Sequence, residues 1–170
     1  MKLNINFRSL IFPGLLLAVA VVLAVANYVP GTYLSGWDTL HPEFNFGLYF
    51  KRTLFGVWQE HQGLGAVAAQ SHAGDLPRLL IYYPLSLFLS ADFLRWAYFF
   101  ICLLLGPLGV YFFLKHITNK SWVGYSAGLL YLLNLGTLQH FYLPFEMFAT
   151  HFATLPWLFL FAVRFLESGN

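Results

Sequence analysis

The stretch "WAYFFICLLLGPLGVYFFL", Trp96–Leu114, decides the fold class of this chain. It contains no Asp, Glu, Lys or Arg, and its length is close to the roughly 20 apolar residues that a helix needs to cross a bilayer. Of the 170 residues, 59% are hydrophobic and only 9% are charged, against about 25% charged in an ordinary soluble domain. A soluble fold of this length could not bury so much apolar surface. The sequence therefore predicts an all-α membrane protein.

Three further apolar runs continue this pattern along the chain. They cover residues 10–29, 122–138 and 147–163, and none of them contains an Asp, Glu, Lys or Arg. The last two are shorter than the roughly 20 residues that a span needs, so we expect the aromatic residues that flank them to lie within the membrane as well. A cleaved signal peptide is the alternative for the first run, because "AVA" before Asn27 resembles a cleavage site. That run exceeds the roughly 7–15 apolar residues of a signal peptide, which favours an uncleaved span.

The segment Leu79–Leu89, "LLIYYPLSLFL", decides the orientation of these spans. It is short and carries Pro84 in its middle, which favours an interfacial or re-entrant element. If it does not cross, five basic residues near the ends of the spans face the cytoplasm, as the positive-inside rule expects. These residues are Lys2, Arg8, Lys115, Lys120 and Arg164. We therefore predict one membrane domain over residues 1–170, with four transmembrane helices (10–29, 96–114, 122–138 and 147–163), a cytoplasmic N-terminus and a long exported loop over residues 30–95.

The exported loop contains a predicted amphipathic helix, residues 42–62. Phe46, Phe50, Leu54 and Val57 recur at helical spacing and form one apolar stripe. Such a helix lies on the membrane surface, where Lys51 and Arg52 would reach the depth of lipid phosphates. The two cations either handle a substrate phosphate or only anchor the helix to anionic lipid.

Polar residues that could take part in chemistry gather in this same loop. Asp38 precedes the predicted helix and is either a helix cap or a general base at the mouth of a membrane cavity. His41 and Glu43 form a His-x-Glu pair, a weak metal signal that leaves a divalent cation open. The remaining candidates in the loop either surround the site or only pack at the surface. They are Glu60, His61, His72 and Asp75.

The pentapeptide "GYSAG", Gly124–Gly128, matches the nucleophile motif G-x-S-x-G. That motif requires a strand before it and a helix after it, whereas this copy begins a predicted membrane span. The same residues form Gly-x-x-x-Gly, which lets helices approach closely. We therefore interpret Gly124 and Gly128 as packing residues.

Three stretches give the chain a family resemblance: "GWDTLHPEFNF", "KRTLFGVWQEHQGLG" and "YLLNLGTLQHFYLPFEMF". Together with an early aspartate in a long exported first loop, they resemble the C-type (GT-C) integral-membrane glycosyltransferases. The similarity is greatest to the bacterial arabinofuranosyltransferase-like and YfhO-like proteins. The resemblance covers essentially the whole chain but only the N-terminal part of such enzymes, which have many more spans. We therefore expect the chain to be an N-terminal fragment.

The resemblance implies transfer of a sugar from a polyprenyl-phosphate-linked donor to an envelope glycan or lipid acceptor outside a bacterial-type cytoplasmic (inner) membrane. Asp38 is the residue that matches the general base of the family. The candidates for binding the donor phosphate are Lys51, Arg52 and Arg78. Residues that could surround the base or contact the acceptor are His41, Glu43, Glu60, His61, His72 and Asp75.

Two other functions compete with sugar transfer. A transporter or flippase subunit would place polar residues or broken helices near mid-membrane, where this chain has Asn134 and His151. A membrane scaffold without catalytic activity is the third hypothesis. A nucleic-acid partner is not expected, because the formal net charge is only +2 and the chain has no basic run.

Overall fold

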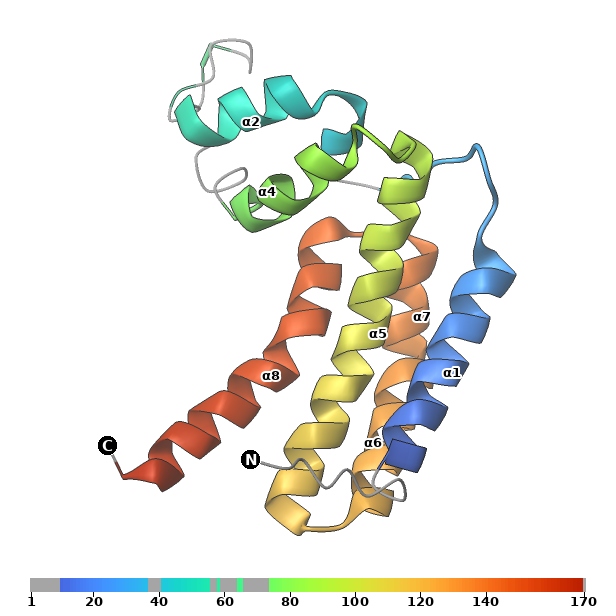
Figure 1. The fold of residues 1–170 in the computed structure, drawn as a ribbon, viewed down its shortest axis with the longest axis vertical. Helices are drawn as coiled ribbons and strands as arrows, with labels where there is room; N and C mark the ends of the chain where they lie inside the picture. The colour runs from blue at the N-terminus through green and yellow to red at the C-terminus, as the bar shows by residue number, and fades with distance from the viewer. Residues whose placement is uncertain (1–9, 37–40, 56–57, 59–63, 66–73, 170) are drawn as a thin grey trace. The chain divides into compact units, whose positions relative to one another are not determined.

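The computed structural model describes residues 10–36, 41–55, 58, 64–65 and 74–169 (Figure 1). All regular secondary structure in this part of the chain is helical, which confirms the predicted all-α class. The chain divides into two compact units. Unit 1 comprises Met1–Val29, Leu34–Thr39 and Trp96–Asn170, and unit 2 comprises Pro30–Tyr33 and Leu40–Arg95.

Unit 1 is built from α1 (Ile11–Asn27), α5 (Ala91–Thr118, from Trp96 onward), α6 (Ser121–Leu133), α7 (Leu135–Tyr142) and α8 (Glu146–Ser168). Helix α1 packs against α6, and α7 contacts both α6 and α8 (Figure 1). Helices α5 and α8 are long and apolar enough to cross a membrane. Helix α1 is also apolar but has only 17 residues.

Helix α5 extends beyond the predicted span 96–114 at both ends. The additional turns are polar: Asp92 lies in the first turn, and Lys115 and His116 lie in the last. An acid at the N-terminus and cations at the C-terminus of a helix both complement its dipole. The apolar run therefore marked the centre of this helix and not its ends.

Glycines allow α6 to approach its neighbours closely. A Cβ atom at Gly124 would lie 2.5 Å from the backbone oxygen of Tyr111 on α5, and one at Gly128 would lie 2.8 Å from a methyl group of Leu16 on α1. Ser126, between them, is exposed. The structure therefore confirms that Gly-x-x-x-Gly in this chain is a packing surface.

The predicted span 122–138 is not one helix. Helix α6 ends at Leu133, Asn134 adopts an extended backbone conformation (ψ 161°), and α7 begins at Leu135. The Asn134 side chain takes over hydrogen bonds that a continuous helix would make: its Oδ1 accepts from the Thr137 amide, and its Nδ2 donates to the Leu130 and Tyr131 carbonyls. Asparagine competes with the backbone in this way, which is the physical reason for the break.

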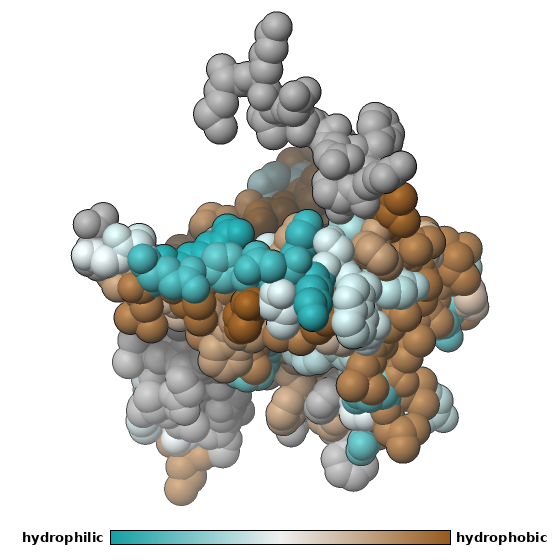
Figure 2. Space-filling model, turned by 90° about the horizontal axis from the view of Figure 1, so that it is seen from below, coloured by the Kyte–Doolittle hydropathy of each residue, from teal (hydrophilic) through white to brown (hydrophobic). Residues whose placement is uncertain are grey.

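Charged residues gather at the end of unit 1 where α5 meets α6, and Figure 2 shows them as a hydrophilic band among hydrophobic residues. His116 Nε2 on α5 lies 2.6 Å from Glu167 Oε2 on α8. Lys115 and Lys120 lie close by in sequence at the same turn. A polar end on an otherwise apolar helical unit is typical of a membrane–water boundary.

Unit 2 contains η2 (Pro42–Phe44), α2 (Phe46–Phe55) and α4 (Leu76–Leu85), followed by the first residues of α5. The predicted helix 42–62 is thus interrupted at Asn45 and its last described helical residue is Phe55. Asn45 stops the first turn because its backbone is extended, with φ −158°. Its side chain then accepts a hydrogen bond from the Leu48 amide at 2.9 Å, which satisfies a free amide at the start of α2.

The buried face of α2 differs from the predicted stripe. Phe46 is buried and Phe50 half-buried, as expected, but Leu54 is 48% exposed and Val57 lies outside the described residues. Tyr49, which the stripe omitted, is buried. The buried face of α2 includes Tyr49 because its hydroxyl group donates a hydrogen bond to Asp75 inside unit 2.

Helix α4 packs against α2 through aromatic rings. The Tyr83 ring lies 6.4 Å from that of Phe46 and 6.2 Å from that of Phe50. The helix has 10 residues, which corresponds to a length of about 15 Å, half of the roughly 30 Å of a hydrocarbon core. It is therefore too short to span a membrane, in agreement with the interfacial interpretation of this segment.

Candidate functional site

The polar centre of unit 2 begins at Glu43. Pro42 occupies the first position of η2, where its missing amide hydrogen costs nothing. His41 before it has a left-handed backbone (φ 42°), so the chain turns sharply into η2. This turn directs Glu43 inward, and its side chain is almost completely buried.

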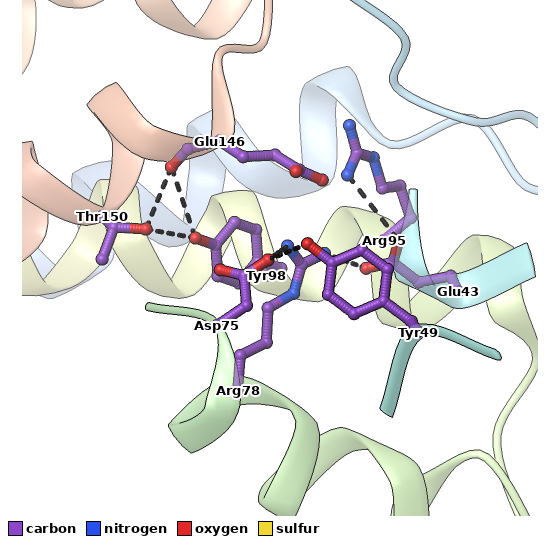
Figure 3. A network of polar contacts seen from close by, with 8 residues as sticks. All are labelled: Glu43, Tyr49, Asp75, Arg78, Arg95, Tyr98, Glu146 and Thr150. Carbon is purple, nitrogen blue, oxygen red and sulfur yellow. Dashed lines mark hydrogen bonds and ion pairs between the residues drawn. The ribbon is translucent and has the colours of Figure 1, made fainter. Parts of the chain in front are cut away.

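Two arginines meet the buried Glu43 carboxylate (Figure 3). Arg78 of α4 donates through Nη2 to Glu43 Oε1. Arg95, at the start of α5, places Nη1 3.7 Å from Glu43 Oε2. Arg95 is 0% exposed and Arg78 is 7% exposed. One carboxylate therefore joins η2 to two helices that are distant in sequence.

A second carboxylate, that of Asp75, completes the cluster. Its Oδ2 accepts a hydrogen bond from the Tyr49 hydroxyl at 2.9 Å and lies 3.9 Å from Arg78 Nη1. Asp75 occupies the cap position of α4, yet its side chain makes no capping hydrogen bond. The carboxylate is instead directed toward Tyr49 and Arg78, which links α4 to α2. We call these five residues, Glu43, Tyr49, Asp75, Arg78 and Arg95, the ion cluster.

The ion cluster is balanced in charge and shielded from solvent. It contains two carboxylates and two guanidinium groups, and every member is less than a tenth exposed. Buried charges are costly unless they are paired and hydrogen-bonded. The contacts between these charges therefore hold η2, α2, α4 and the start of α5 together. Because the two carboxylates are buried, they are not available to solvent as free acids or bases.

The three predicted phosphate-binding residues differ in how far their side chains are exposed to solvent. Lys51 is exposed and Arg52 half-buried, and both lie on α2. Arg78, by contrast, contacts the two carboxylates of the ion cluster. Lys51 and Arg52 therefore present their charge nearer to solvent than Arg78 does.

The other predicted site residues separate into three groups. Glu43 and Asp75 come together in the ion cluster. His41 is half-buried, with its ring 5.1 Å from that of Phe44. The rest lie outside the described residues, so their predicted roles stay predictions; they are Asp38, Glu60, His61 and His72.

Sequence reasoning missed Tyr49 and Arg95. Arg95 is the last cation before a long apolar run, a position that suggests a snorkelling residue at a membrane boundary. Tyr49 was hidden by the choice of helical stripe. A clue was available for Tyr49, which lies three residues after Phe46 and therefore on the same face of the helix.

Metal-binding geometry does not occur in the described part of the chain. No three His, Cys, Asp or Glu residues there gather closely enough to hold an ion. In the ion cluster the two carboxylates are each opposed by arginine, which is the arrangement of an ion-pair network.

Unit 1 has a smaller polar contact of its own, between α5 and α8. The Tyr98 hydroxyl contacts Thr150 Oγ1 and donates to the Glu146 carbonyl at 3.3 Å (Figure 3). Further along the same helices, the Trp157 indole donates to the Leu105 carbonyl at 3.0 Å. These bonds fix the packing of α8 on α5 with side chains that remain compatible with lipid surroundings.

Comparison with known proteins adds no relative. No protein-family model matches the chain, and no curated protein or solved structure is significantly similar to it. The resemblance to C-type glycosyltransferases therefore rests on the sequence stretches that carry it.

Proposed function

We propose that this chain serves sugar transfer at the outer face of a bacterial-type inner membrane, from a polyprenyl-phosphate-linked donor to an envelope glycan or lipid. Residues 30–95 could serve the transfer reaction or merely connect two spans. One observation favours a role in the reaction: this segment contains the buried ion cluster. An inert linker has no need to bury four charged side chains. A site that acts on a sugar and a phosphate needs such a rigid polar frame.

The proposed topology has four crossings, made by α1, α5, α6 with α7, and α8. Helices α5 and α8 have the length and composition for this. The basic residues Lys115, Lys120 and Arg164 favour the cytoplasm for the end of unit 1 that contains the α5–α6 turn. Residues 30–95 are then exported.

The proposed chemistry divides the polar residues by role. Asp38 removes the proton from an acceptor hydroxyl as that oxygen attacks the anomeric carbon. The leaving polyprenyl phosphate gains negative charge, which positioned cations stabilise. Lys51 and Arg52 are the better candidates for this, because Arg78 is already opposed by two carboxylates. Arg78 is then a positioning residue.

Transport across the membrane is the second candidate function, and the break at Asn134 favours it. Transporters place discontinuous helices around their substrate sites, and α6 and α7 form such a pair. A non-catalytic scaffold remains the third.

One reconstitution experiment separates these functions. The full chain is placed in proteoliposomes with polyprenyl-phosphate donors that carry a radiolabelled hexose or pentose, and with envelope glycan as acceptor. Label in the glycan supports transfer, provided that an Asp38→Asn variant inserted to the same extent gives much less. Movement of the labelled donor to the opposite leaflet without glycan labelling supports the flippase alternative. Absence of both in correctly inserted protein contradicts the proposed transfer and leaves the scaffold.

A further inference from the structure

Unit 1 contains a cavity of about 340 Å³ beside the break at Asn134. Its walls come from α1, α5, the end of α6 and the whole length of α7. The volume lies within the roughly 300–1,000 Å³ of small-molecule sites. The cavity is therefore large enough for a ligand and is built entirely by unit 1.

The lining of the cavity is apolar and uncharged. Leu23 of α1, Phe100 and Leu103 of α5, and Leu138 and Phe141 of α7 are typical wall residues. Among the side chains that the structure describes, no Asp, Glu, Lys, Arg or His lines it. A pocket with so apolar a lining favours ligands that are themselves largely apolar.

The polar residues at the break do not change this character. Asn134 uses Nδ2 to reach two carbonyls and the Thr137 hydroxyl, and Oδ1 to accept from the Thr137 amide. The Thr137 hydroxyl in turn donates to the Tyr131 carbonyl at 2.6 Å. The break thus satisfies its own hydrogen bonds and leaves an apolar wall.

At membrane depth, a break in a helix is tolerated where it lines a cavity or is buried in protein. Discontinuous helices commonly form ligand sites for this reason. The break and the cavity coincide here, because residues 132–135, 137 and 138 all line the cavity.

Asn27 places a polar group at the edge of the cavity. Asn27, the last residue of α1, is exposed and donates one hydrogen bond, to the Leu23 carbonyl at 2.7 Å. Its amide has further hydrogen-bonding capacity. Trp96 and Tyr142 also line the cavity, and such amphipathic rings favour the membrane interface. The lining therefore suits a molecule with an apolar body and a polar end.

We infer that this cavity, the break pocket, binds the hydrocarbon chain of a membrane lipid, with the polar end of the chain near Asn27. The chain can be isoprenoid or acyl, since both present the same flexible hydrocarbon. The inference rests only on the membrane location in the proposed function and is independent of sugar transfer.

Photolabelling of the full chain tests the break pocket. Two probes are used in separate liposome preparations: a phospholipid with a diazirine on its acyl chain, and a polyprenyl phosphate with a diazirine on its isoprenoid chain. After irradiation, adducts are mapped by mass spectrometry of peptides. Concentration of adducts on pocket-lining residues is expected with at least one probe, and the probe that gives more identifies the natural lipid class.

Matched variants distinguish the pocket from general contact with lipid. Leu23→Trp fills the pocket from α1, and Val22→Trp adds the same ring at a neighbouring position that is 65% exposed. Leu138→Trp fills it from α7, and Leu158→Trp on α8 is its control, because both leucines are 64% exposed. Each filling variant should lower pocket labelling about tenfold, equivalent to about 1.4 kcal/mol, and each control should leave it unchanged.

The outcomes separate this inference from the proposed function. Uniform labelling of all lipid-facing residues, or equal labelling in filling and control variants, overturns the break pocket. Extraction of the protein by alkaline carbonate contradicts the proposed membrane location instead. In that case the same variants are labelled in detergent micelles with the same probes, and the pocket is judged by the same comparison.

Discussion

Arg78 donates a hydrogen bond to Glu43, and this contact joins two residues that are 35 positions apart in the chain. Both side chains are almost completely buried. The pair gains its strength from the exclusion of water, which also makes it costly to leave either partner alone. The contact therefore holds η2 against α4 and orders the segment in which the proposed chemistry takes place.

Removal of the Glu43 carboxylate should loosen unit 2. Glu43→Leu leaves the guanidinium groups of Arg78 and Arg95 short of a buried negative charge, which should cost about 3–5 kcal/mol. Faster hydrogen exchange of the backbone amides of α2 and α4 would report this loss. A double variant, Glu43→Leu with Arg95→Met, restores the charge balance, leaves Arg78 paired with Asp75 and should recover most of the protection. Equal exchange in the parent and the Glu43→Leu variant would contradict a stabilising role for the ion cluster.

Gly124→Ala should destabilise unit 1. The new methyl group would meet the Tyr111 carbonyl, a backbone atom that cannot turn aside, and such overpacking costs about 1–3 kcal/mol. Buried Cys102 allows a thiol-reactive dye to report thermal unfolding of this unit. Gly14→Ala on α1 is the control, because nothing lies within 4 Å of the added atom. It should be neutral or stabilising by up to about 1 kcal/mol. Identical melting of both variants would show that α6 does not depend on this close approach.

Asn134→Leu should disturb the break between α6 and α7. The variant loses the acceptor for the Thr137 amide, a capping interaction worth about 0.5–2 kcal/mol. Increased hydrogen exchange at Thr137, with less change in the middle of α6, is the expected result. Gln139→Leu changes a nearby exposed position and should leave Thr137 protected. If Asn134→Leu also preserves that protection, the asparagine is not what holds the break.

Accessibility of single cysteines tests the proposed topology. On a Cys102→Ala background, Lys51→Cys and Gln139→Cys should react with an impermeant thiol reagent added to intact cells. Lys120→Cys should react only after permeabilisation. All three positions are exposed in the structure, so reaction reports membrane sidedness and not burial. External reaction of Lys120→Cys would contradict the proposed four-span topology.

Asp38→Asn should abolish most sugar transfer while leaving folding intact. The substitution removes the proton acceptor, and general-base catalysis is worth about 10²–10⁴-fold. Asparagine has nearly the same size and shape as aspartate, so expression and insertion should be normal. If Asp38 is not the base, Asp38→Asn and Asp38→Ala should give similar transfer, because the cap position of η2 is occupied by His41 and a loss of capping is not expected. Near-normal transfer by Asp38→Asn would remove this residue as the base.

The sequence by itself determined the all-α class, the centres of α1, α5 and α8, and the packing role of Gly124 and Gly128. These features depend on local properties: apolar composition over a helix length, and the absence of side chains at a fixed spacing. It could not give the ends of α5, because the added turns are polar and stand outside the hydrophobic run.

Only the tertiary structure decided what the polar residues contact. Arg78 was predicted to bind phosphate, and it lies against Glu43 and Asp75 because a guanidinium group pairs equally well with a carboxylate or a phosphate. Which partner it meets depends on residues far away in the chain. The same holds for the break at Asn134. From the sequence alone, an asparagine in an apolar run fits either a continuous helix or a helix cap. In the structure Asn134 caps α7, and the break lies beside the cavity between α1, α5 and α7.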